Sequence, residues 1–156
     1  MITVDVAKPS DIDTLVVLLA SLFADEAEFA ADSAKQKVGL ELILNDSTQG
    51  QILVAREADS VVGMVNLLFT VSTALGGHVA ILDDLIVTPA YRSKGVGKLL
   101  MDAALNFCSA RGFARISLQT DSDNYTAQHL YESRGFVRSS MISYKKILFV
   151  QDNVQS

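Results

Sequence analysis

One loop of this chain combines residues suited to holding a phosphate group. The segment 87–98 reads VTPAYRSKGVGK and lies between a strand-like run and a helix-like run. Its glycines, Gly95 and Gly97, let the backbone approach a ligand closely, since neither carries a β-carbon. A helix that begins here adds unpaired backbone N–H groups and the positive end of its dipole. The segment also carries three basic side chains, Arg92, Lys94 and Lys98. Together these features predict a binding site for an anion such as a pyrophosphate.

Two common phosphate-binding motifs do not match this loop. The Walker A pattern G-x-x-x-x-G-K-[ST] needs a hydroxyl after its lysine, but Leu99 follows Lys98 and Arg92 occupies the first glycine position. The dinucleotide pattern G-x-G-x-x-G, started at Gly95, needs glycine where Leu100 stands. The sequence therefore disfavours both an ATPase and a dinucleotide-binding domain.

The loop does resemble the [QR]-x-x-G-x-[GA] signature of the GNAT N-acetyltransferase superfamily, through Arg92, Gly95 and Gly97. Further along, the segment 124–136, NYTAQHLYESRGF, is similar to the family pattern N-x-x-A-x-x-[LF]-Y-x-x-x-G-F. The two motifs occur in the order that the family shows, and the resemblance extends over residues 2–149. It implies a GNAT-like fold and an N-acetyltransferase that uses acetyl-CoA as co-substrate.

The resemblance also implies where acetyl-CoA binds. In the family, the strand before the loop splays from its neighbour, and the backbone of Leu85, Ile86 and Val87 would run beside the pantetheine arm. The pyrophosphate would lie on the loop, and Asn124 matches a position that contacts the pantetheine or the acceptor. The expected loop contacts are Arg92, Ser93, Lys94, Gly95, Val96, Gly97 and Lys98.

Two further residues are implied to be catalytic. Tyr131 matches the general acid that protonates the departing CoA thiolate, although an aromatic residue late in an amphipathic helix can also be a core residue. Asp83 matches an acidic position that some members use as the base that accepts the amine proton. Its neighbour Asp84 is expected to be structural, because consecutive strand residues face opposite sides of a sheet. A water relay in place of Asp83 stays open.

The acceptor is expected to be a small primary amine. Acidic residues after the first helix could attract a cationic amine such as a polyamine or a basic amino acid: Asp25, Glu26, Glu28 and Asp32. The alternatives are that these carboxylates are a solvated helix end, that the acceptor is a protein amine, or that the chain is a non-catalytic CoA-binding sensor or interaction module.

Hydrophobic periodicity predicts the elements that position these residues. Strands are expected over 2–6, 51–56, 61–71, 78–87, 115–119 and 141–150. Helices are expected from Ser10, from Ser33 to about Leu44, from Val96 to just before Gly112, and over 124–134. These elements predict a single α+β domain, residues 1–150, with a mixed, mostly antiparallel sheet that has helices on both faces, and a mobile tail over 151–156.

Composition limits the class of protein. The chain has 156 residues, 49% of them hydrophobic and 20% charged, which is typical of a globular domain and excludes disorder. No uninterrupted apolar run is long enough to span a membrane, and no basic n-region indicates a secretory signal. A single cysteine, Cys108, suits a cytoplasmic protein, and His78 and His129 lack partners at metal-ligand spacing, so no metal is expected. The apolar segment 147–150 would suit a homodimer.

Charge is distributed unevenly along the chain. The net charge is −5, which disfavours nucleic acid and anionic membrane as partners. Residues 1–85 hold 13 acidic and 4 basic side chains, whereas residues 86–115 hold 5 basic side chains and only Asp102 against them. The basic segment contains the loop that is expected to bind the CoA phosphates.

Overall fold

The computed structural model describes residues 1–24 and 32–149 of the chain. The chain divides into two compact units, Met1–Gln119 and Thr120–Ser156. The expected tail 151–156 and the acidic residues Asp25, Glu26 and Glu28 lie outside the described residues.

The described part of the first unit forms a five-stranded sheet in the order β1-β2-β3-β4-β5. Neighbouring strands are antiparallel, except that β4 and β5 are parallel. The strands are β1 (Ile2–Val6), β2 (Gly50–Glu57), β3 (Ser60–Ser72), β4 (Gly77–Val87) and β5 (Ile116–Leu118). Each lies within two residues of a strand that the apolar alternation predicts.

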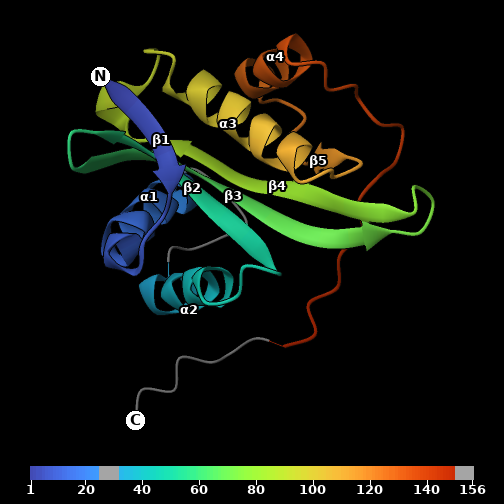
Figure 1. The fold of residues 1–156 in the computed structure, drawn as a ribbon, viewed down its shortest axis with the longest axis horizontal. Coiled ribbons are helices and arrows are strands. Elements are labelled where there is room, and N and C mark those ends of the chain that lie inside the picture. Colours follow the sequence, from blue (N-terminus) through green and yellow to red (C-terminus); the bar gives the residue numbers. More distant parts are fainter. Residues whose placement is uncertain (25–31, 150–156) are drawn as a thin grey trace. The chain divides into compact units, whose positions relative to one another are not determined.

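Helices cover both faces of this sheet. Figure 1 shows α1 (Ile12–Ala24) and α2 (Ser33–Leu44) on one face and α3 (Val96–Ala110) on the other. Short 3₁₀ turns, η1 (Pro9–Asp11) and η2 (Pro89–Tyr91), precede α1 and the loop before α3. The second unit contains α4 (Tyr125–Ser133). The predicted α+β class, with a mostly antiparallel sheet between helices, is confirmed.

The main apolar core lies between the sheet and the first two helices. Leu15 and Leu19 of α1 and Leu40 of α2 pack against Ile52 of β2 and Ile86 of β4. All five are at most 5% exposed. On the opposite side of the sheet, α3 buries one stripe of its surface, which holds its first turn on the sheet. The buried residues are Val96, Leu100, Met101, Ala104 and Cys108.

An ion-pair cluster ties the start of the chain to β2. The Arg56 guanidinium donates to both carboxylate oxygens of Asp11, at 2.8 and 2.6 Å, and to Asp5 Oδ1 at 3.0 Å. Asp11 also accepts a hydrogen bond from the Lys8 backbone N–H at 2.7 Å. Arg56 and these hydrogen bonds hold the pKa of the Asp11 carboxyl below its usual value. The cluster fixes the entry into α1. The sequence places the helix start at Ser10, whereas the structure has a 3₁₀ turn over Pro9–Asp11, with Lys8 as its N-cap, and begins α1 at Ile12.

The strand predicted over 141–150 is wrong for the residues that the structure describes. Residues 141–149 have no regular secondary structure, and large apolar side chains among them are exposed, including Leu148 at 89%. The apolar pattern alone predicted this strand. A strand also needs a neighbouring backbone for its N–H and C=O groups, and a pattern cannot supply one.

Candidate functional site

The predicted anion loop leads directly into the N-terminus of α3. The Thr88 N–H donates to Val62 O at 2.9 Å, which fixes the loop's start beside β3. Gly95 is the N-cap of α3 with φ of 83°, a left-handed conformation that glycine adopts without strain. No side-chain hydrogen bond caps the helix there. The free N–H groups of a first turn and the positive end of the helix dipole are what an anion requires.

Ser93 is also in the left-handed region, with φ of 62°. For a residue with a β-carbon this conformation is strained, and such strain tends to persist where the surroundings or a function require it. Ser93 and Gly95 together turn the chain sharply between η2 and α3. The predicted anion-binding loop therefore leads through this turn into the first turn of α3.

The basic side chains of the loop have distinct settings. Arg92 folds back onto the end of β4, where its Nε donates to Val87 O at 3.2 Å. Lys94 lies over the Tyr91 ring, with Nζ 5.2 Å from the ring centroid, and Lys98 is exposed on the first turns of α3. The loop therefore presents cationic groups without an acidic residue among them.

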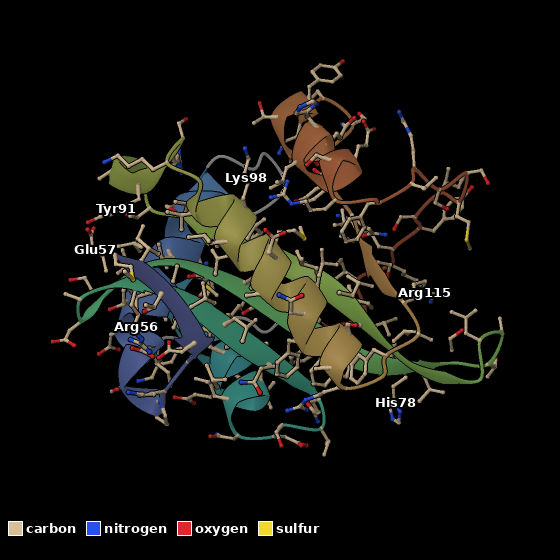
Figure 2. All side chains as sticks on the ribbon, turned by 45° about the horizontal axis from the view of Figure 1, so that its top comes forward. Arg56, Glu57, His78, Tyr91, Lys98 and Arg115 are labelled. Atoms are coloured by element: carbon tan, nitrogen blue, oxygen red, sulfur yellow. The ribbon has the colours of Figure 1, made fainter. Side chains whose placement is uncertain are left out.

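The end of β2, at the β2–β3 hairpin, contacts this loop. The Tyr91 hydroxyl donates to the Glu57 carboxylate, which raises the pKa of Tyr91. Glu57 is the last residue of β2, and Figure 2 shows the two side chains together. This contact joins η2 to a strand end distant in sequence, so the loop is anchored at both β3 and β2.

The strand before the loop has an open edge. β4 pairs with β5 only at Ala80, Ile81 and Leu82, yet β4 continues to Val87. Across the other edge, β4 stays paired with β3 through Leu85, Ile86 and Val87. Among the described residues of the first unit, no strand pairs with β4 on the β5 side beyond Leu82. This unpaired edge can accept an extended ligand by backbone hydrogen bonding.

A β-bulge lies where that edge opens. Leu67 pairs with Leu82 and Val65 pairs with Leu85, so Asp83 and Asp84 both stand opposite the single residue Asn66. The strict alternation expected for Asp83 and Asp84 does not hold here, because the extra residue of the bulge interrupts it. Position in the strand therefore does not exclude either carboxylate from the same side of the sheet.

The two aspartates have different surroundings. Asp84 is half-buried, and its Oδ2 accepts a hydrogen bond from Asn66 Nδ2 at 2.8 Å. Asp83 is an exposed residue, yet desolvation by the surrounding protein raises the pKa of its carboxyl group. A carboxyl with a raised pKa is a better proton acceptor than an ordinary aspartate. Asp83 as the base and Asp84 as a structural residue stay predictions.

Two buried amide side chains, which the sequence analysis did not single out, lie on the α1–α2 side of the sheet. Asn66 is 3% exposed and Gln36 of α2 is 9% exposed. Among residues 1–24 and 32–149, Asn66 Oδ1 and both amide atoms of Gln36 have no hydrogen-bond partner. Each buried polar atom without a partner costs about 1–3 kcal/mol. The signal that could have found Asn66 is its polar side chain inside the apolar run of β3.

In the second unit, Tyr131 is placed by a C-terminal cap of α4. Gly135 has φ of 89°, the Phe136 N–H donates to Tyr131 O at 3.1 Å, and the Gly135 N–H donates to Glu132 O at 3.1 Å. These are the two bonds of a Schellman motif, whose usual apolar contact is made here by the Tyr131 and Phe136 rings, with centroids 6.0 Å apart. The spacing of tyrosine, glycine and phenylalanine thus fixes Tyr131. Its partial burial raises its pKa.

Asn124 begins the same helix. Its Oδ1 accepts a hydrogen bond from the Ala127 N–H at 3.2 Å, which makes it the N-cap of α4. Asp32 has the same role on α2, where its side chain accepts from the Lys35 N–H at 3.1 Å. The structure therefore gives both residues a local role as helix caps, besides the ligand contacts expected from sequence.

Other reactive groups do not form a site. Cys108 is buried, and burial raises the pKa of its thiol to about 11, so it is not a thiolate at neutral pH. In residues 1–24 and 32–149, no group of three metal-ligating side chains could hold an ion. No helix of this same part is long and apolar enough to cross a membrane.

Comparison with known proteins agrees with this geometry. Residues 18–136 match the model of the Acetyltransferase (GNAT) family. An uncharacterized N-acetyltransferase of Bacillus subtilis, YhfO, is 32% identical over 83% of this chain and 86% of its own length. The mycothiol acetyltransferase of Renibacterium salmoninarum is 35% identical over 61% of this chain, which corresponds to 29% of that protein.

Solved structures share the fold. A possible acetyltransferase from Clostridium difficile superposes with a TM-score of 0.86 at 21% identity, covering 96% of this chain and 99% of that one. The aminoglycoside N-acetyltransferase AAC(6')-Iy, solved with CoA, has a TM-score of 0.79 at 15% identity, covering 94% of this chain and 95% of its own.

Proposed function

The chain belongs to the GNAT acetyltransferase family and is an acetyl-CoA-dependent N-acetyltransferase, and on that premise we propose that it acetylates a small primary amine by direct attack in a ternary complex. The observation that carries the proposal is the unpaired edge of β4 beyond Leu82, which leads into a glycine-containing loop and an uncapped helix N-terminus. An edge for an extended arm followed by a phosphate cradle matches the shape and charge of acetyl-CoA.

The chain's own residues would hold the co-substrate as follows. The backbone of β4 from Leu85 to Val87 offers hydrogen bonds to the amide groups of the pantetheine arm. Amides from Arg92 to Lys98, at the N-terminus of α3, receive the pyrophosphate. The exposed Lys94 and Lys98 side chains add charge, and the 3′-phosphate is a further partner for them.

The chemistry needs one proton acceptor and one proton donor. The neutral amine attacks the thioester carbon, so that a C–N bond forms and the C–S bond breaks. Asp83 accepts the amine proton, directly or through water, and Tyr131 donates its hydroxyl proton to the CoA sulfur. The raised pKa of Tyr131 keeps this proton in place at neutral pH. The family match over residues 18–136 includes parts of both compact units, which supports the proposal that they act as one acyltransferase domain over 1–150.

The acceptor in this proposal is a cationic amine. The acidic N-terminal half favours a cationic amine, and similar proteins are named for several acceptors: an aminoglycoside, mycothiol and the alanine of ribosomal protein bS18. A protein amine is therefore the second candidate. Incubation with a mixed amine library and acetyl-CoA, followed by mass spectrometry of the products, distinguishes them. Preference for amines that also carry a carboxylate, and so have no net positive charge, would contradict the cationic acceptor.

Replacement of Tyr131 by phenylalanine tests the proposed mechanism. Loss of a general acid lowers kcat by roughly 10²–10⁴-fold, whereas the affinity for acetyl-CoA, measured by calorimetry, should change little. The matched control is Tyr125→Phe, at the 74% exposed first residue of the same helix, which should leave kcat unchanged. Equal turnover by the Tyr131→Phe protein and the wild type would show that Tyr131 is not the acid.

A further inference from the structure

Resting on the proposed function, we infer that Asn66 and Gln36 form the acceptor subsite and that the acceptor carries, besides its reacting amine, a neutral group that both donates and accepts hydrogen bonds, such as a hydroxyl. The basis is a set of three buried polar atoms without partners: Asn66 Oδ1, Gln36 Oε1 and Gln36 Nε2. Buried polar groups in proteins are nearly always paired, so each exception calls for an explanation. A bound acceptor that completes these hydrogen bonds explains all three.

Both side chains lie in the layer between the sheet and α2. Gln36 precedes Leu40 by one helical turn, so the two residues share a face of α2. Leu40 belongs to the same apolar cluster as Ile52, and Ile52 is the strand partner of Asn66. Figure 1 shows α2 under the face that β2 and β3 present to it. The unpaired amides are thus on one side of the sheet, within a cluster that is otherwise apolar.

Asn66 also contacts β4, the strand that carries the proposed base Asp83. Its Nδ2 donates to Asp84 Oδ2 at 2.8 Å, and this bond fixes the amide so that Oδ1 is left as an acceptor. Asn66 stands opposite the bulge of β4, and β4 loses its β5 partner directly after Leu82. Adjacent strands are about 4.8 Å apart, so Asn66 is one strand away from the open edge. An amine that approaches this edge can donate an N–H hydrogen bond to Asn66 Oδ1.

Gln36 determines the chemistry of the second group. Its amide has both a donor and an acceptor unpaired. An ammonium only donates and would leave Nε2 unpaired, and a carboxylate only accepts and would leave Oε1 unpaired. A hydroxyl or a carbamoyl group satisfies both atoms. A second formal charge at so buried a position would also be costly without a counter-charge.

A matched set of primary alkylamines tests this inference. Each amine ends in a hydroxyl, a carbamoyl, a methyl or an ammonium group, and the set is repeated over a series of short chain lengths. We expect wild-type kcat/KM to be at least roughly tenfold higher for the hydroxyl or carbamoyl amine than for the methyl amine at the best length, since a site built to hydrogen-bond a polar group rejects the analogue that lacks it. Equal values, or a preference for the ammonium amine, would overturn the inference.

Variants separate the two amides. The Gln36→Met protein should lose the preference for the hydroxyl amine over the methyl amine. The control Gln51→Met, in strand β2, should keep this preference. Asn66→Ala, which loses the contact with the amine common to all substrates, should lower kcat/KM for the whole set. A Gln36→Met protein that keeps the preference would refute the assignment of Gln36.

Thermal unfolding gives a readout that does not depend on turnover. Removing two unpaired polar atoms should leave free Gln36→Met at least as stable as the wild type, whereas loss of a structural glutamine would lower its unfolding temperature. If wild type acetylates no amine of the set, the proposal of a small amine acceptor fails. In that case a destabilised Gln36→Met protein overturns the inference as well, and an equal or higher unfolding temperature supports a ligand role for Gln36.

Discussion

Replacement of Gly95 by alanine separates the conformational role of the loop from its role in binding. Gly95 has φ of 83°, and a β-carbon built there would meet no atom within 4 Å. The substitution therefore causes backbone strain but no clash. A residue with a β-carbon in the left-handed region costs about 1–2 kcal/mol. The smaller conformational freedom of the unfolded alanine chain offsets about 0.4–1 kcal/mol of this. The net loss in the free energy of unfolding is about 1 kcal/mol.

Gly112 provides a matched control for this strain. It follows α3 with φ of 72°, and again no atom lies within 4 Å of a built β-carbon. Gly112→Ala should therefore lose the same stability, about 1 kcal/mol, which corresponds to about 2–4 °C in Tm for a chain of this size. Urea or thermal unfolding of both variants measures this loss.

Binding of acetyl-CoA should distinguish the two variants. If the loop holds the pyrophosphate as proposed, the new methyl group at Gly95 lies where that group approaches the backbone. Loss of one charge-assisted hydrogen bond, worth about 1.5–3 kcal/mol, weakens Kd roughly ten- to hundredfold. At Gly112 the affinity should equal that of the wild type. Calorimetric titration with acetyl-CoA measures both, and equal affinities for the two variants would show that this loop is not the phosphate cradle.

Two further predictions concern charge. Asp11→Asn should lower the free energy of unfolding by about 1.5–3 kcal/mol at neutral pH, because it weakens the charge-assisted bonds to Arg56. Since the pKa of Asp11 is lowered, its contribution to stability is present above the ordinary aspartate pKa of 3.8 and is lost as the pH falls through the folded value. Urea unfolding from neutral to acid pH should show a flatter acid limb in the variant. If Asp83 is the base, its raised pKa places the acid limb of the kcat/KM profile above 3.8. Asp83→Asn should remove that limb, and an unchanged profile would favour the water relay.

Much of the fold could be predicted from local patterns. The apolar alternation of β2, β3 and β4 and the helical spacing in α1 and α3 place each element within a few residues, because these periods are set by backbone geometry alone. The segment 141–149 is the exception, since an apolar pattern without a strand partner does not make a strand. The same local reasoning placed the start of α3 at Val96 and the end of α4 just before Gly135, and the structure has Gly95 and Gly135 in the left-handed region at these two ends.

The contents of the site divide in the same way. The sequence by itself determined the family, through the loop at Arg92, Gly95 and Gly97 and the segment that ends in Tyr131, Gly135 and Phe136, because both motifs consist of neighbours in the chain. Only the tertiary structure decided which side chains meet across strands and layers. The bulge that brings Asp83 and Asp84 opposite Asn66, and the burial of Gln36 without a partner, depend on strand register and on the packing of α2. Those contacts join residues far apart in sequence, and no local period encodes them.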